Sequence, residues 1–140
     1  MAHLPVIGSK RGESRQRAGQ PWIFKSDVTR ASGAAPGAVV RVLGPGGRPL
    51  GFAFFSAQSE IQLRMIDRGE SLSPTFLRDR LLAARAWREA IAPGVEALRI
   101  VHGEGDGLPS LVVDRYGDYL VIQTLAQATD ARKAEIADAL

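Results

Sequence analysis

The sequence predicts an α+β protein: a small, mostly antiparallel β-barrel with one early helix, followed by a second module of helix, strands, hairpin and helix. Between residues 38 and 67, short apolar runs alternate with turns rich in Gly and Pro, which is typical of a small barrel. A single polar helical stretch precedes these runs, and a helical periodicity over residues 73–91 follows them. We therefore expect two domains, residues 1–69 and residues 70–140.

The first expected helix is the polar stretch from Ser9 to Ala18. Ser9 is a suitable N-cap, Gly19 is a suitable left-handed stop, and Pro21 prevents the helix from continuing. Barrel strands are then expected at residues 38–43, 49–55 and 60–66, with the second of them central because it is apolar on both faces.

A longer helix opens the second module. Ser73 and Pro74 give a cap followed by proline, and Pro93 and Gly94 end the helix after Ile91. Its spacing predicts an apolar face of Leu77, Leu81, Ala84, Trp87 and Ile91, and a solvated face of Arg78, Asp79, Arg85, Arg88 and Glu89.

The rest of this module reads as strands, a hairpin and a helix. We expect strands at residues 98–101, 110–113 and 119–125, with a turn at residues 114–118 in which Asp114 and Arg115 pair locally. Thr129 is the expected cap of a last helix, residues 130–140. The apolar residues of this helix form a face that could pack against a partner, so we expect that the chain could self-associate through it.

Composition excludes several classes of protein. Apolar residues make up 45% and charged residues 24% of the chain, and no apolar run reaches the roughly 18–20 residues of a membrane helix. The first residues lack the pattern of a secretion signal, so we expect a cytoplasmic protein without a membrane partner. The absence of cysteine removes disulfides, thiolate metal sites and a cysteine nucleophile.

The positive charge is concentrated in the first half of the chain. Residues 1–70 contain ten Lys and Arg against five Asp and Glu, whereas residues 71–140 contain eight against ten. Helical spacing places Arg11 and Arg15 on one face, with Lys10 and Arg17 beside it. This basic ridge predicts binding to a polyanion such as RNA, although a solvated helix face would have the same composition. Both arginines are expected to be exposed, so that changing them would alter stability by no more than about 0.5 kcal/mol.

Two residues next to the ridge, the aromatic Trp22 and the basic Lys25, complete the candidate RNA-binding set. Phe24 is expected in the barrel core. For Trp22 two roles stay open: packing inside the barrel, or stacking on an unpaired base.

His102, Glu104 and Asp106 could bind a metal ion or exchange protons, but Gly103, Gly105 and Gly107 favour a turn with hydrogen bonds to nearby amides. We therefore predict no catalytic and no metal-binding residue in this chain. A small metal-dependent hydrolase that uses these three side chains is the least favoured alternative.

Two motifs resemble one known family. The first is the order Gly-Glu-x-Asp-Gly-Leu-Pro-x, three apolar residues, then Asp-Arg-aromatic-Gly, over residues 103–117. The second is Gln-Pro-Trp-Ile-Phe, which follows the basic helix at residues 20–24. Their order and separation resemble the S-adenosylmethionine-dependent 23S rRNA cytosine-5 methyltransferases of the large-subunit methyltransferase I type, and the resemblance covers the whole chain.

The resemblance implies an N-terminal PUA domain that binds RNA, 23S rRNA in the family, followed by a partial middle domain. It also implies that S-adenosylmethionine and the reactive cysteine belong to a later catalytic domain that this chain lacks. We therefore expect a chain without cofactor and without activity that positions RNA during rRNA processing. The alternative is a stand-alone RNA-binding or ribosome-assembly factor.

Overall fold

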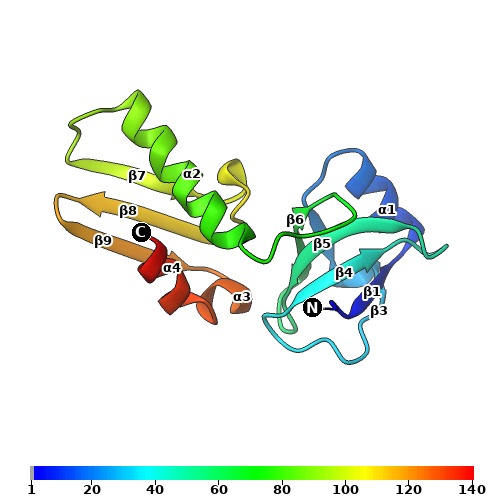
Figure 1. The fold of residues 1–140 in the computed structure, drawn as a ribbon. Helices are drawn as coiled ribbons and strands as arrows, with labels where there is room; N and C mark the ends of the chain where they lie inside the picture. Colours follow the sequence, from blue (N-terminus) through cyan, green and yellow to red (C-terminus); the bar gives the residue numbers. More distant parts are fainter. Residues whose placement is uncertain (1) are drawn as a thin grey trace. The chain divides into compact units, whose positions relative to one another are not determined.

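The computed structural model describes residues 2–140 and has the predicted α+β fold (Figure 1). The chain divides into two compact units between Leu72 and Ser73. Each unit has a hydrophobic core of its own.

The first unit is a curled six-stranded sheet with one helix (Figure 1). The spatial order of its strands is β2-β6-β5-β4-β1-β3, and neighbouring strands are antiparallel except β1 and β4, which pair in parallel. In chain order the elements are β1 (Pro5–Gly8), α1 (Lys10–Arg17), β2 (Trp22–Phe24), the 3-10 turn η1 (Lys25–Asp27), β3 (Val28–Arg30), β4 (Val39–Leu43), β5 (Pro49–Phe55) and β6 (Ile61–Asp67).

Strand β5 lies at the centre of the first unit, as its apolar sequence predicts. It pairs with β4 on one side and β6 on the other, and every residue from Leu50 to Phe55 is buried. Gly51 has a φ of +123°, and an added Cβ would overlap the carbonyl oxygen of Asp67. Glycine is therefore required where β5 meets the end of β6.

In β2 the buried residue is Ile23, and the prediction that Phe24 enters the core is wrong. Trp22 and Phe24 are half-buried, whereas Ile23 is fully buried in the core of the first unit. Successive side chains of a strand point to opposite faces, so only the middle one of these three residues faces inward.

The first helix confirms the predicted caps. The Ser9 hydroxyl accepts a hydrogen bond from the Gly12 amide at 3.1 Å, and Gly19 has a φ of +101° just after the helix ends. These contacts satisfy backbone groups that have no partner inside the helix.

The second unit is a three-stranded antiparallel sheet, in the order β7-β8-β9, with its longest helix packed on β7 (Figure 1). Its elements are α2 (Phe76–Ile91), β7 (Ala97–His102), the 3-10 turn η2 (Gly103–Asp106), β8 (Leu111–Tyr116), β9 (Tyr119–Thr124), α3 (Gln127–Asp130) and α4 (Lys133–Ala139). The core consists of residues from α2, the strands, the segment after η2 and α4: Leu77, Leu81, Ala84, Ile100, Val101, Leu108, Leu111, Val113 and Ile136.

The predicted apolar face of α2 is correct for its first half and wrong for its second. Leu77, Leu81 and Ala84 are buried, whereas Trp87 is 60% and Ile91 58% exposed. At 100° per residue, position 88 falls nearer the centre of the buried stripe than position 87 does. Arg88 occupies that place and pairs with Asp106, so its assignment to the solvated face is also wrong.

Helix α2 also begins later than predicted. Its first helical residue is Phe76, and Thr75 rather than Ser73 stands at the N-cap position. The Ser73 hydroxyl instead accepts a hydrogen bond from the Thr75 amide at 3.2 Å, which closes a turn before the helix.

The end of the chain forms two short helices, α3 and α4, where one was predicted. Thr129 is not a cap but a buried residue of α3, whose hydroxyl donates to the carbonyls of Ala126 and Ser110. Helix α3 ends at Asp130, and α4 begins at Lys133.

The predicted hairpin of β8 and β9 exists, but its turn is shorter than expected. Strand β8 continues to Tyr116, which pairs with Tyr119 across Gly117 and Asp118. Asp114 and Arg115 therefore lie within the strand, and Asp114 pairs with Arg99 of β7 rather than with Arg115.

Candidate nucleic-acid interface

Helix α1 carries four of the six residues predicted to bind RNA. Lys10, Arg11, Arg15 and Arg17 are all exposed, but Lys10 and Arg17 do not share the neighbours of Arg11 and Arg15. Arg11 and Arg15 face η1, whereas Lys10 and Arg17 face the turn between β4 and β5. The predicted ridge is therefore two separate basic surfaces.

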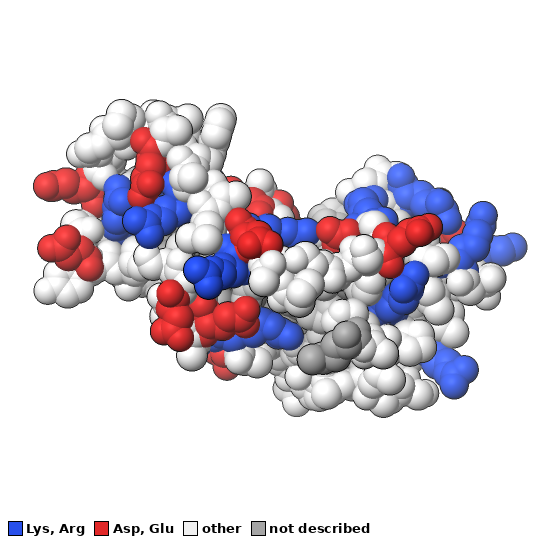
Figure 2. All heavy atoms as spheres, in the orientation of Figure 1, with Lys and Arg blue, Asp and Glu red and all other residues white. Residues whose placement is uncertain are grey.

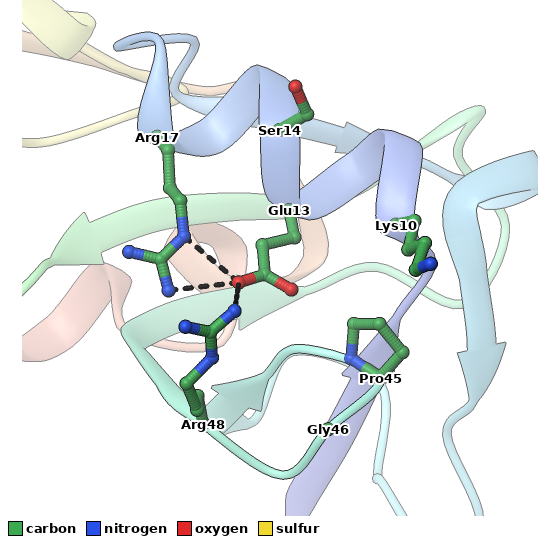
Figure 3. A pocket seen from close by; sticks show the side chains of 7 residues that line it. All are labelled: Lys10, Glu13, Ser14, Arg17, Pro45, Gly46 and Arg48. Carbon is green, nitrogen blue, oxygen red and sulfur yellow. Dashed lines mark hydrogen bonds and ion pairs between the residues drawn. The ribbon is translucent and has the colours of Figure 1, made fainter.

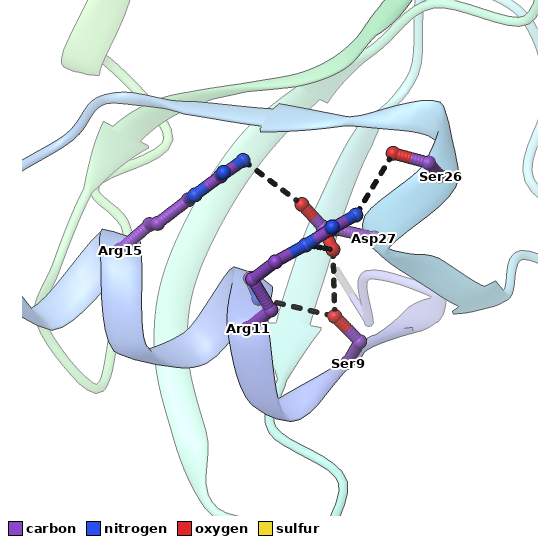
Figure 4. Close-up of polar contacts among 6 residues, drawn as sticks. Ser9, Arg11, Arg15, Ser26 and Asp27 are labelled. Atoms are coloured by element: carbon purple, nitrogen blue, oxygen red, sulfur yellow. Dashed lines mark hydrogen bonds and ion pairs between the residues drawn. The ribbon is translucent and has the colours of Figure 1, made fainter.

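Arg11 and Arg15 hold a buried carboxylate (Figure 4). Asp27 is 2% exposed, and its Oδ1 accepts from Arg11 Nε at 2.7 Å and from the Ser9 hydroxyl at 3.0 Å. Its Oδ2 accepts from Arg15 Nη1 at 3.4 Å. We call Ser9, Arg11, Arg15, Ser26 and Asp27 the Asp27 cluster.

The charge state of Asp27 follows from these contacts. Burial raises the pKa of Asp27, but the hydrogen bonds from Arg11 and Ser9 and the charges of Arg11 and Arg15 outweigh it, so the pKa lies below its ordinary value of 3.8. Arg11 and Arg15 are exposed, as predicted, but each also contacts a buried ionised group, so we now expect a larger effect on stability than at an ordinary exposed position.

The other basic surface surrounds a second shielded carboxylate (Figure 3). Glu13 is 8% exposed, and its Oε1 accepts a hydrogen bond from Arg17 Nε at 2.9 Å and forms an ion pair with Arg17 Nη2 at 2.9 Å. The same oxygen accepts from Arg48 Nη2 at 3.3 Å. Beside it lies a cavity of about 510 Å³, the Glu13 pocket, which is lined by Lys10, Glu13, Ser14, Arg17, Pro45, Gly46 and Arg48.

Sequence reasoning missed Glu13 and Arg48 as members of this site. The spacing of four residues between Glu13 and Arg17 could have indicated their pairing, because such residues are neighbours on a helix. Arg48 lies 35 residues away on the turn after β4, and no local pattern relates it to Glu13.

Trp22 and Lys25, the other two predicted residues, lie on the segment that follows α1. Trp22 is half-buried at the start of the edge strand β2, where it pairs with Arg64 of β6. Lys25 is exposed in η1, which α1 contacts together with β2. All six predicted residues thus belong to contiguous elements of the first unit. In the region of α1, basic atoms surround a few acidic ones on the face drawn in Figure 2.

In the second unit, the segment around His102, Glu104 and Asp106 forms the predicted turn. Asp106 accepts from the His102 amide at 2.7 Å and pairs with Arg88. Within residues 2–140, no group of three or more His, Asp or Glu side chains is placed to hold a metal ion.

Arg99 and Asp114 form a second ion pair in this unit, across β7 and β8. Arg99 donates to the two carboxylate oxygens at 2.9 and 3.2 Å, and it lies 3.3 Å from Nδ1 of His102. The hydrogen bond from Arg99 lowers the pKa of Asp114 and outweighs the opposite effect of burial.

Comparison with known proteins finds a family match within the first unit. The PUA-like domain family matches residues 9–68, which include α1 and every strand from β2 to β6. Ribosomal RNA large subunit methyltransferase I of Cronobacter sakazakii is 34% identical over 140 residues, which cover 96% of this chain and 35% of that protein. The protein of the same name from Klebsiella pneumoniae has the same identity and coverage, and that from Salmonella gallinarum is 33% identical.

Over nearly its whole length, the chain is similar to part of the proteins named ribosomal RNA large subunit methyltransferase I. The resemblance predicted from the two sequence motifs is thereby confirmed. The chain spans about a third of the length of the methyltransferase I proteins that it matches.

Two solved structures share the fold of this chain. One is a protein assigned as a methyltransferase and solved with SAH, with a TM-score of 0.82 and 19% identity over 97% of this chain and 36% of its own. The other is assigned as a SAM-dependent methyltransferase from Streptococcus mutans, with a TM-score of 0.80, the same identity and the same coverage. No helix in residues 2–140 is long and apolar enough to cross a membrane.

Proposed function

We propose that this chain is the RNA-binding front end of an rRNA methyltransferase-like protein, and that it positions RNA for a catalytic domain. The observation that carries the proposal is that the PUA-like match, residues 9–68, contains the basic helix α1 and all six candidate contact residues. Its relatives are named for large-subunit rRNA, so 23S rRNA is the partner that we propose.

Both faces of α1 remain available to phosphate groups. The side chains of Arg11 and Arg15 are 59% and 45% exposed while they hold Asp27, and a guanidinium has more N–H donors than these contacts use. Lys10 and Lys25 are exposed as well. Arginine and lysine at these places would neutralise backbone phosphates, which is the main source of affinity for RNA.

The half-buried Trp22 is the proposed base-stacking residue. An indole at a strand edge next to exposed cations is the kind of platform on which an unpaired base stacks. We assign catalysis and S-adenosylmethionine binding to the part of the family that this chain does not span, and we place the protein with its rRNA in the cytoplasm.

The proposal is tested by fluorescence anisotropy of a labelled 23S rRNA hairpin with the whole chain. Between about 50 and 200 mM KCl the affinity should fall steeply, because phosphate contacts release counterions. A DNA duplex of equal length is the control for unspecific attraction. Equal affinity for the duplex, or no binding at 50 mM KCl, would contradict the proposal.

The role of Trp22 needs a separate measurement. Trp22→Leu should lower RNA affinity by about 1–3 kcal/mol if the ring stacks on a base. Trp87→Leu is the matched control, since Trp87 is exposed in the second unit. A loss of thermal stability with unchanged affinity would assign Trp22 to packing alone.

A further inference from the structure

The Glu13 pocket brings together three cations from two elements (Figure 3). Lys10 and Arg17 come from α1, whereas Arg48 comes from the turn between β4 and β5. The pocket contains one carboxylate, that of Glu13, so its lining has an excess of two positive charges. Its volume of about 510 Å³ exceeds that of a single phosphate group and leaves space for an attached sugar.

Glu13 arranges the two guanidinium groups instead of neutralising the pocket. One of its oxygens, Oε1, accepts a hydrogen bond from each arginine and also forms an ion pair with Nη2 of Arg17. In the described part of the chain, Arg17 Nη1, Arg48 Nη1 and the Lys10 ammonium have no hydrogen-bonding partner. These donors remain for a ligand, and guanidinium N–H groups match the oxygens of a phosphate.

We propose that the Glu13 pocket binds a backbone phosphate of RNA, with Lys10 and Arg48 as contact residues and Glu13 as a positioning residue. The inference rests on the proposed RNA binding of this chain and names a site for it. It also distinguishes the two faces of α1: Arg11 and Arg15 hold the buried Asp27 while they stay exposed to RNA, and the opposite face contributes to the pocket.

Gly44 provides independent support for this arrangement. An added Cβ at Gly44 would overlap the Glu13 carboxylate, so the carboxylate occupies the space that any larger residue would fill. Gly44→Ala therefore moves the carboxylate and the two arginines that it holds without changing any charge.

The first test compares salt dependence of RNA binding for the whole chain and its variants, with a labelled 23S rRNA hairpin as probe. Lys10→Ala and Arg48→Ala should each weaken binding several-fold and lower the slope of log K against log salt by about one contact. Arg30→Ala is the matched control, because Arg30 is exposed in the same unit, and it should keep the wild-type slope.

Two results would overturn the inference in distinguishable ways. If the wild-type chain binds RNA steeply and the Lys10→Ala/Arg48→Ala double variant keeps its slope, the pocket is not the phosphate site. If the wild-type chain does not bind RNA, the proposed function fails as well. Displacement of the RNA by polyglutamate at matched ionic strength would instead identify an acidic peptide as ligand.

A second test isolates the positioning role of Glu13. Glu13→Ala raises the net charge by one, so it should strengthen RNA binding if Glu13 only neutralises the pocket, and weaken it if Glu13 positions the arginines. Gly44→Ala should weaken binding in the same way with no change in charge. Gly105→Ala is its control, since Gly105 lies outside the pocket and the nearest atom to an added Cβ there, Cδ2 of His102, is 4.0 Å away. Wild-type affinity in the folded Gly44→Ala variant would contradict the role given to Glu13.

Discussion

Arg88 donates two parallel hydrogen bonds to Asp106, from Nη1 to Oδ1 at 2.6 Å and from Nη2 to Oδ2 at 2.8 Å. This pair joins α2 to the η2 turn, and both side chains are largely buried. Asp106 also accepts from the His102 amide, so a single carboxylate fixes the turn on the helix. Asp106 therefore has a structural role in the second unit, where it holds the η2 turn against α2.

Asp106→Ala should destabilise the second unit by about 1–3 kcal/mol, because the mostly buried Arg88 then lacks its partner. Urea unfolding followed at the amide NMR signals of β8 measures the change in that unit. Asp138→Ala, which removes an exposed carboxylate of α4, should change stability by no more than about 0.5 kcal/mol. Equal effects of the two variants would contradict the structural role of the pair.

Arg11→Ala should destabilise the first unit by about 1–2 kcal/mol, because Asp27 loses its shortest hydrogen bond in a buried place. The loss is limited because Ser9 and Arg15 still contact the carboxylate. Urea unfolding observed at β4 amides provides the measurement, with Arg30→Ala as control. An Arg11→Ala variant as stable as the control would show that Asp27 does not need this partner.

Acid should destabilise the second unit through Asp106 and Asp114. Burial raises the pKa of Asp106, but the hydrogen bonds from Arg88 and the His102 amide outweigh it; for Asp114 the hydrogen bond from Arg99 is the main cause of a lowered pKa. The pKa of each group in the folded state therefore lies below its ordinary value of 3.8. Near that pH the unfolded state binds more protons than the folded state does, so the free energy of unfolding of the second unit falls as the pH drops below about 4.

The measurement is the free energy of unfolding of the second unit at pH 6 and pH 3. Asp114→Asn should be less stable than wild type at pH 6 and should lose less stability on acidification. If the free energy of unfolding of the wild type changes between pH 6 and pH 3 by as little as that of the variant, Asp114 contributes nothing to the pH dependence.

Gly51→Ala should destabilise the first unit by at least about 1–2 kcal/mol. Its positive φ disfavours any Cβ, and the Cβ would also overlap the Asp67 carbonyl. Thermal unfolding detects the change, and Gly46→Ala, where the added Cβ meets open space, should stay close to wild type. Wild-type stability of the Gly51→Ala protein would contradict this prediction, because β5 and β6 would then move apart with no loss of free energy of unfolding.

Calorimetry of this chain with S-adenosylmethionine should show no saturable binding. Such binding needs a strand, a glycine-rich loop and a helix, with an acidic residue after the next strand, and the sequence does not contain that order. A measurable affinity would contradict the assignment of the cofactor to the part of the family that this chain does not span.

Local patterns determined most elements of this protein, because caps, turns and periodicity act between residues close in the chain. Ser9 and Gly19 set the ends of α1, and the apolar run after Pro49 set the central strand β5. The two family motifs likewise sufficed for the resemblance to the methyltransferase I family.

Only the tertiary structure decided what the charged residues do. Arg11 meets Asp27 across 16 residues, Arg88 meets Asp106 across 18, and Arg48 meets Glu13 across 35. A sequence pattern counts charges and faces, but it does not contain the distance between elements that approach one another only when the strands pair. For the same reason the sequence predicted one basic ridge on α1, whereas the structure has two basic surfaces. Segment η1 packs beside one of them, and the turn after β4 packs beside the other.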